Sequence, residues 1–121
     1  MKAEELRIGN YVLDEDREIS KIEQISSDNI HKFTLVSGDA INIYPSNIYP
    51  IPLTEEILLK CGIVNGEIEI KGRVVEIYQH FGDDKIWFFN IEHNLTVEIN
   101  YLHQLQNIFY CLTGEELTIN L

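Results

Sequence analysis

The chain has 121 residues, of which 45% are hydrophobic, and these values are typical of one folded domain and exclude a disordered protein. Twenty acidic residues against nine basic ones give a formal net charge of −11 at pH 7. Direct binding to nucleic acid is therefore not expected, because the protein would need Lys and Arg side chains to replace the counterions of the phosphates. The acidic surface either speeds association with a basic protein or only keeps the protein soluble.

The first half of the chain is rich in short segments with strand character. The five predicted strands cover residues 11–13, 18–25, 29–36, 40–44 and 48–52. Prolines at 45, 50 and 52 place the last segment at an edge of the sheet or outside it. The acidic run at residues 14–18 is expected to form a loop between two strands. Five short strands in this space predict a small half-open barrel or a meander.

Residues 54–61 carry a complete local signal for one short helix. Thr54 is a natural N-cap, and Glu55 and Glu56 place negative charge at the positive end of the helix dipole. Gly62 can adopt the left-handed conformation that often ends a helix.

A second group of strands follows this helix. The predicted strands cover residues 66–70, 73–79, 85–91 and 95–99, with turns at 71–72, 82–84 and 93–94. Residues 85–91 are apolar on both faces, which favours a central strand. The alternation of Glu67, Ile68, Glu69 and Ile70 predicts a strand with one buried and one exposed face.

The last predicted element is a helix that begins after Asn100, its expected N-cap, and ends at Gly114. Its apolar residues recur at steps of three and four: Leu102, Leu105, Ile108, Phe109 and Leu112. Uncharged polar residues are expected on its other faces: His103, Gln104, Gln106, Asn107 and Tyr110. Such a helix packs on its own domain and also offers a surface to a partner.

Together these elements predict an α+β fold in a single domain, residues 1–121. Residues 1–52 form a strand-rich part, a small barrel or a meander. Residues 53–121 form a short helix, an antiparallel sheet and a C-terminal helix that covers the sheet.

The N-terminal residues, the lengths of the apolar runs and the two cysteines together indicate the cellular compartment. Residues 1–6 show no signal-peptide pattern, and no apolar run approaches the length of a membrane span. Cys61 and Cys111 both lie in helical contexts near an apolar face, which predicts two buried, reduced thiols. We expect a soluble, cytoplasmic protein.

Catalytic and metal-binding motifs are not found in the sequence. There is no Gly-x-Ser-x-Gly motif and no phosphate-binding glycine loop. His80 with Asp83 and Asp84 could bracket a cation, but two Asp residues in a glycine turn are common without metal. His103 and Cys111 would lie about 80° apart around a helix and about 12 Å apart along it, which argues against a thiolate–imidazole pair. We expect a protein that is not an enzyme and has no cofactor or metal.

Candidate partner-binding residues come from glutamates on neighbouring strands and from tyrosines. The glutamates are Glu67, Glu69, Glu76, Glu92 and Glu98. They form either a solvated outer face or a docking surface for Arg and Lys side chains of a partner. A hydrolase with paired carboxylates is a third, weaker interpretation. Tyr49 and Tyr110 are the candidate interface anchors, because Tyr is enriched at binding hot spots.

Three segments resemble a known family. They are residues 5–10 (ELRIGN), 51–62 (IPLTEEILLKCG) and 103–117 (HQLQNIFYCLTGEEL). Their order and spacing resemble small, uncharacterised proteins encoded by phages, prophages and mobile elements of Bacteroidetes-type bacteria. The resemblance implies no catalytic residues. It implies a context in which small acidic proteins bind basic host-defence proteins, such as CRISPR nucleases with their basic guide and target channels.

We therefore expect a non-enzymatic, acidic protein-binding module of phage or mobile-element type. Its expected action is anti-CRISPR-like, as an inhibitor of a basic host-defence nuclease or of that nuclease's RNA complex. Two alternatives stay open: an accessory protein that self-associates through its C-terminal helix, and a small hydrolase without a recognisable motif. The sequence does not determine the oligomeric state.

Overall fold

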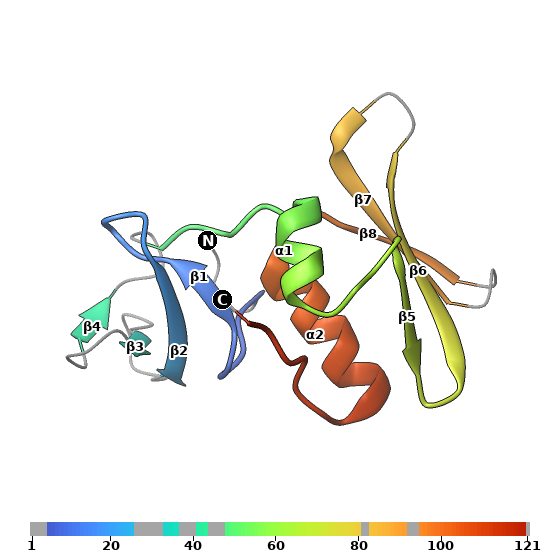
Figure 1. Ribbon diagram of the computed structural model, residues 1–121. Helices are drawn as coiled ribbons and strands as arrows, with labels where there is room; N and C mark the ends of the chain where they lie inside the picture. The colour runs from blue at the N-terminus through green and yellow to red at the C-terminus, as the bar shows by residue number, and fades with distance from the viewer. Residues whose placement is uncertain are drawn as a thin grey trace. The chain divides into compact units, whose positions relative to one another are not determined.

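The computed structural model describes residues 5–25, 33–36, 41–43, 48–80, 83–91 and 95–120. The chain divides into two compact units, Met1–Ile51 and Pro52–Leu121. The predicted boundary between the two parts, at residues 52 and 53, lies next to this division. The first unit contains a sheet, and the second contains a sheet and two helices (Figure 1). The predicted α+β class is confirmed.

The first unit is an antiparallel meander with the strand order β1-β2-β3-β4. Its strands are β1 (Tyr11–Leu13), β2 (Ile19–Ile25), β3 (Phe33–Val36) and β4 (Ile41–Ile43). Each matches a predicted strand in its described part. Residues 37–39, between the predicted strands at 29–36 and 40–44, lie outside the described residues.

The fifth predicted strand, at residues 48–52, is wrong. This segment makes one isolated bridge, in which Leu13 and Tyr49 exchange two backbone hydrogen bonds of 2.8 and 2.9 Å. Pro50 and Pro52 have no N–H group, so a ladder cannot continue along the segment.

The ELRIGN segment forms a tight turn around the buried Asn10. The Arg7 N–H donates to Asn10 Oδ1 (2.7 Å), and the Asn10 N–H donates to Arg7 O (3.0 Å). Gly9 has a φ of 98°, which favours glycine, and its N–H donates to Ile22 O (2.8 Å). These residues therefore have a structural role at the entry to β1.

The acidic run at residues 14–18 is a loop between β1 and β2, as predicted. Asp14 Oδ1 accepts the backbone N–H groups of Asp16 and Glu18, each at 2.9 Å. Asp14 Oδ2 accepts the Ser20 hydroxyl (3.2 Å). One carboxylate thus organises the loop, which is the usual use of Asp in turns.

The second unit begins with the predicted short helix, α1 (Glu55–Lys60). Thr54 is its N-cap, and the Thr54 hydroxyl oxygen accepts the Ile57 N–H (3.2 Å). Gly62 has a φ of 80° after the last turn. The Ile63 N–H then donates to Leu58 O (3.0 Å), which closes the helix end as the local signals predict.

Backbone and side-chain bonds hold the segment before α1 on the rest of the second unit. The Leu53 N–H donates to Asn100 O (3.0 Å), and Pro52 forms an isolated bridge with Tyr101. The indole Nε1 of Trp87 donates to Leu53 O (3.1 Å). These contacts fix the start of α1 relative to the sheet.

The sheet of the second unit has four antiparallel strands in sequence order. They are β5 (Glu67–Ile70), β6 (Arg73–His80), β7 (Asp83–Ile91) and β8 (Leu95–Ile99). Lys71 and Gly72 join β5 to β6 with φ values of 49° and 82°, as in a type I′ turn. Asp83 and Asp84, which were expected in a turn at 82–84, belong to β7, where Asp83 pairs with His80.

The pairing register gives this sheet one buried and one exposed face. The buried face carries Val75, Ile77, Trp87, Phe89 and Ile99. Both helices of the second unit lie on one side of the sheet, so the predicted cover of the sheet by a helix is confirmed (Figure 1). β7 lies between β6 and β8, in the central position that its apolar sequence predicts.

The last helix, α2 (Leu102–Thr113), is also confirmed, but its N-cap is Tyr101 and not Asn100. Gln104 Oε1 reaches back and accepts the N–H groups of Asn100 (2.8 Å) and Tyr101 (3.2 Å). The Asn100 side chain instead accepts the Trp87 N–H (3.4 Å) and donates to Glu98 (3.1 Å). The Asn100 side chain therefore binds residues of the sheet and does not cap α2.

The buried face of α2 differs from the predicted one. Gln106 and His103 are buried, although an exposed polar back was expected, and Leu112 is exposed. At about 100° per residue, the buried Leu102, Gln106 and Thr113 lie within about 40° of one another around the helix. No helix in the described part of the chain is long and apolar enough to cross a membrane.

Candidate functional site

Cross-strand pairing brings four of the five predicted glutamates onto one face of the second sheet. Glu67 pairs with Glu76, Glu69 with Val74, and Glu98 with Phe88. Paired residues of an antiparallel sheet project to the same side, and this is the exposed side. We call this surface the outer face, and it comprises Glu67, Glu69, Val74, Glu76, Tyr78, Phe88, Asn90, Thr96 and Glu98. Glu92 lies outside the described residues.

Two carboxylates of the outer face stand directly opposite each other, Glu67 on β5 and Glu76 on β6. The Ile77 N–H donates to Gly66 O (2.7 Å), so the Glu67–Glu76 pair occupies a non-hydrogen-bonded position, where side chains lie closest. Like charges in such a pair are destabilising. None of the outer-face residues defined above is Lys or Arg. A local arrangement that opposes stability is typical of a functional surface.

An aromatic pair lies on the same face. The ring centroids of Tyr78 and Phe88 are 5.7 Å apart. The Tyr78 side chain is 41% exposed, and Phe88 is half-buried and pairs with Glu98 on the next strand. Aromatic faces beside carboxylates are suited to arginine and lysine side chains, which interact with both.

The two tyrosines singled out from the sequence lie elsewhere. Tyr49 belongs to the first unit and is half-buried, with the Arg17 guanidinium 3.9 Å from its ring centroid. Tyr110 is exposed on α2, a helix that covers the other face of the sheet. Neither is part of the outer face, and their role in partner binding stays a prediction.

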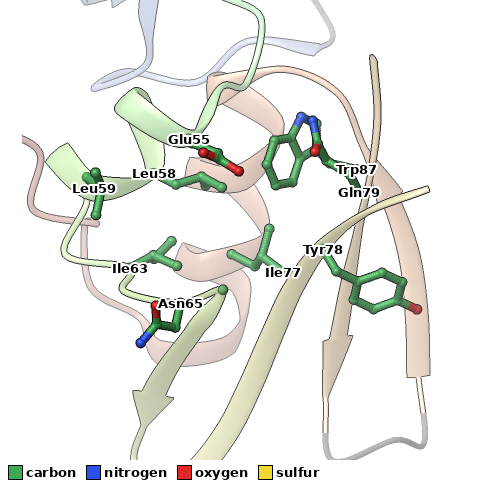
Figure 2. A pocket seen from close by; sticks show the side chains of 10 residues that line it. Glu55, Leu58, Leu59, Ile63, Asn65, Ile77, Tyr78, Gln79 and Trp87 are labelled. Carbon is green, nitrogen blue, oxygen red and sulfur yellow. The ribbon is translucent and has the colours of Figure 1, made fainter. Parts of the chain in front are cut away.

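A cleft of about 400 Å³ opens between α1, the turn that follows it, and β6. Figure 2 shows Leu58 from α1 and Ile63 from the turn pointing toward Ile77 of β6. The indole of Trp87 completes the apolar part, and Glu55, Asn65 and Gln79 supply the polar part. This cleft could not be predicted from the sequence, because its residues come from separate segments.

Gly66 holds the turn against β6 and thereby shapes the cleft. Asn65 and Gly66 have φ values of 54° and 72°, and the Glu67 N–H donates to Val64 O (3.1 Å), as in a type I′ turn. A Cβ atom on Gly66 would lie 2.7 Å from Ile77 O. The Asn-Gly pair in the sequence was a usable signal for this turn.

The two thiols differ in their surroundings. Cys61 is buried, and burial raises the pKa of its thiol from 9.0 to about 11. Cys111 is exposed, so the prediction of a second buried thiol is wrong. It lies about 180° around α2 from the buried Leu102, which explains the difference.

Metal ligands do not gather in the described part of the chain. No group of three or more His, Cys, Asp and Glu residues there could hold an ion. The side chains of His80, Asp83 and Asp84 lie outside what the structure describes.

Comparison of the chain with protein-family models, curated proteins and solved structures finds no match. The resemblance to phage and mobile-element proteins stays a prediction. The interpretation of the site therefore depends on its own geometry and charge.

Proposed function

We propose that this protein is an acidic binding module that holds a basic protein on its outer face. The observation that carries the proposal is the direct opposition of Glu67 and Glu76 within a surface that also holds Glu69 and Glu98. A cationic side chain placed between Glu67 and Glu76 would form charge-assisted hydrogen bonds and remove their repulsion.

The aromatic pair supplies the apolar part of the same surface. Tyr78 and Phe88 give a contact area of low conformational freedom beside Glu98. Tyrosine and arginine are both enriched at hot spots, and an arginine of the partner could stack on Tyr78 while it pairs with a carboxylate. The outer face is therefore complementary to an arginine-rich surface.

We propose a nuclease of host defence, such as a CRISPR nuclease or its RNA complex, as the partner. The support is the net charge of −11 and the resemblance of three segments to phage and mobile-element proteins. The guide and target channel of such a nuclease is strongly basic. An acidic module in this channel would compete with nucleic acid and inhibit cleavage.

The test is inhibition of purified CRISPR nucleases by two charge-reversal variants of this protein. The first replaces Glu67, Glu69, Glu76 and Glu98 with Lys. The control replaces Glu15, Glu18, Glu23 and Glu115, which are exposed and lie outside the outer face. Both variants change the net charge equally.

We expect the wild type and the control to inhibit cleavage and the outer-face variant to lose inhibition. Equal loss in both variants would show that only net charge matters and would overturn the assignment to the outer face. Absence of binding and inhibition by the wild type would overturn the choice of partner.

A further inference from the structure

The cleft between α1 and β6 has an apolar floor and a polar rim. Leu58, Ile63, Ile77 and Trp87 are at most 4% exposed, so the floor is formed by firmly packed side chains. The volume of about 400 Å³ lies within the range of roughly 300–1,000 Å³ that small-ligand sites occupy. The volume of the cleft is therefore large enough for an aliphatic chain several atoms long.

The charge of the rim is negative. Glu55 is the charged residue among those that line the cleft, and no Lys, Arg or His is among them. Figure 2 shows the Glu55 side chain extending into the cleft on the side of Trp87. Asn65 and Gln79 add amide groups that can donate and accept hydrogen bonds. This rim disfavours an anion and favours a cation.

We infer that the cleft binds the side chain of an arginine. The volume of the cleft matches the arginine stem, and the planar guanidinium can pair with the Glu55 carboxylate beside Trp87 (Figure 2). A lysine fits less well, because its ammonium group is more strongly hydrated and cannot form the two parallel hydrogen bonds that a guanidinium makes with a carboxylate. A purely apolar side chain would leave the Glu55 carboxylate at the mouth without a cation.

This inference rests on the proposed function, since the arginine would belong to the basic partner on the outer face. Tyr78 and Gln79 are consecutive residues of β6, and both line the cleft. The Tyr78 ring points away from α1, toward the outer face (Figure 2). The cleft and the outer face therefore meet along β6, and one arginine-rich segment could occupy both.

The test uses blocked arginine, N-acetyl-arginine methylamide, and the fluorescence of Trp87, the single tryptophan of the chain. Blocked citrulline has nearly the same shape without the charge and serves as the ligand control. Glu55→Gln is the test variant. Glu56→Gln is the matched protein control, because Glu56 is the next residue of α1 and does not line the cleft.

We expect a saturable change in Trp87 emission with blocked arginine and binding about fivefold weaker with blocked citrulline. Glu55→Gln should weaken arginine binding about fivefold and leave citrulline binding unchanged, and Glu56→Gln should change neither. Equal binding of both ligands, an equal effect of the two variants, or no saturable change would overturn the inference.

The outer-face charge reversal separates this inference from the proposed function. The variant with Lys at 67, 69, 76 and 98 keeps the cleft residues, so it should still bind blocked arginine while it fails to inhibit a nuclease. If arginine binding is absent but the outer-face variant still loses inhibition, the cleft assignment fails and the proposed function stands. If the wild type binds arginine but inhibits no nuclease, the choice of partner fails and the arginine-binding cleft stands.

Discussion

The Cys61 thiol illustrates how position decides the chemistry of a single residue. Its side chain is buried after α1, and burial raises its pKa to about 11 from 9.0, because the thiolate would lose its hydration. Cys111, on the exposed side of α2, has no such protection from solvent. We expect thiol reagents to modify Cys111 in the folded protein and Cys61 only after unfolding.

The raised pKa of Cys61 predicts a loss of stability at alkaline pH. Between about 9 and about 11 the folded state holds a proton that the unfolded state releases, so the free energy of unfolding falls as pH rises through this window. The stabilisation is fully present below about pH 9, and its loss amounts to about 2 kcal/mol by about pH 11. Urea unfolding across this range, compared with Cys61→Ala, measures it. Parallel pH profiles of the two proteins would contradict the prediction.

Replacing Gly66 with Ala should reduce stability through a steric clash in addition to backbone strain, and the two contributions can be separated. Gly66→Ala should lower the free energy of unfolding by about 2–3 kcal/mol, because the new Cβ would lie 2.7 Å from Ile77 O in a left-handed residue. Gly62→Ala is the control, since Gly62 has a similar φ of 80° and nothing within 4 Å of the added atom. It should cost only about 1 kcal/mol. Chemical denaturation of both variants gives the difference, and equal losses would exclude the steric contribution.

At the scale of elements, strand pairing turns isolated glutamates into one surface. Glu67 and Glu69 alternate along β5, so both point to the same side, but their cross-strand neighbours differ. Glu67 faces Glu76, and Glu69 faces Val74. The register of β5 against β6 thus creates a repulsive pair at one position only of this strand.

This difference predicts opposite effects on stability and on binding. Glu67→Gln should raise the free energy of unfolding by about 0.5 kcal/mol, because it removes a like-charge pair, and should weaken binding of the basic partner. Glu69→Gln should leave stability unchanged, since no carboxylate stands opposite. Thermal denaturation and a binding titration of both variants test this. A destabilising effect of Glu67→Gln would contradict the assigned repulsion.

Elements with local signals were predictable from the sequence, and contacts between distant segments were not. α1 is specified by Thr54, the following glutamates and Gly62, which are all neighbours in the chain. The predicted strand at 48–52 was wrong because Pro50 and Pro52 cannot continue a ladder, and the one bridge that forms joins Tyr49 to a residue far away in the sequence. The predicted buried face of α2 was wrong because hydrophobic periodicity alone does not show that the polar Gln106 is buried.

The candidate site also has a part that was predictable from the sequence and a part that was not. Strict alternation placed Glu67 and Glu69 on one exposed face, but only the register shows that Glu76 lies opposite Glu67. The cleft needed α1, the Asn65–Gly66 turn and β6 in their folded positions. No pattern within one segment contains that information.

At the scale of the whole molecule, the charge is unequal between the two units. Residues 1–51 hold nine acidic and five basic residues, which gives −4, and residues 52–121 hold eleven and four, which gives −7. The outer face belongs to the second, more acidic unit. The field of this unit should guide a basic partner before contact.

Steered association predicts that salt acts on the association rate. Raising the ionic strength from about 0.02 M to about 0.5 M should lower the association rate constant with a basic nuclease about tenfold or more and change the dissociation rate constant less. Stopped-flow measurements of the wild type and the outer-face variant test this. An association rate that does not respond to salt would contradict steering.

The anchoring of Leu53 has a consequence for synthesis on the ribosome. This residue follows the boundary between the units, yet its backbone groups are held by Trp87 and Asn100, which are translated later. The first unit contains the hydrogen-bonding partners of its own meander, so it can fold while the second is still emerging. We expect proteases to cut nascent chains that stop before residue 100 within residues 53–60, because this segment is translated early but held in place only by residues that are translated later.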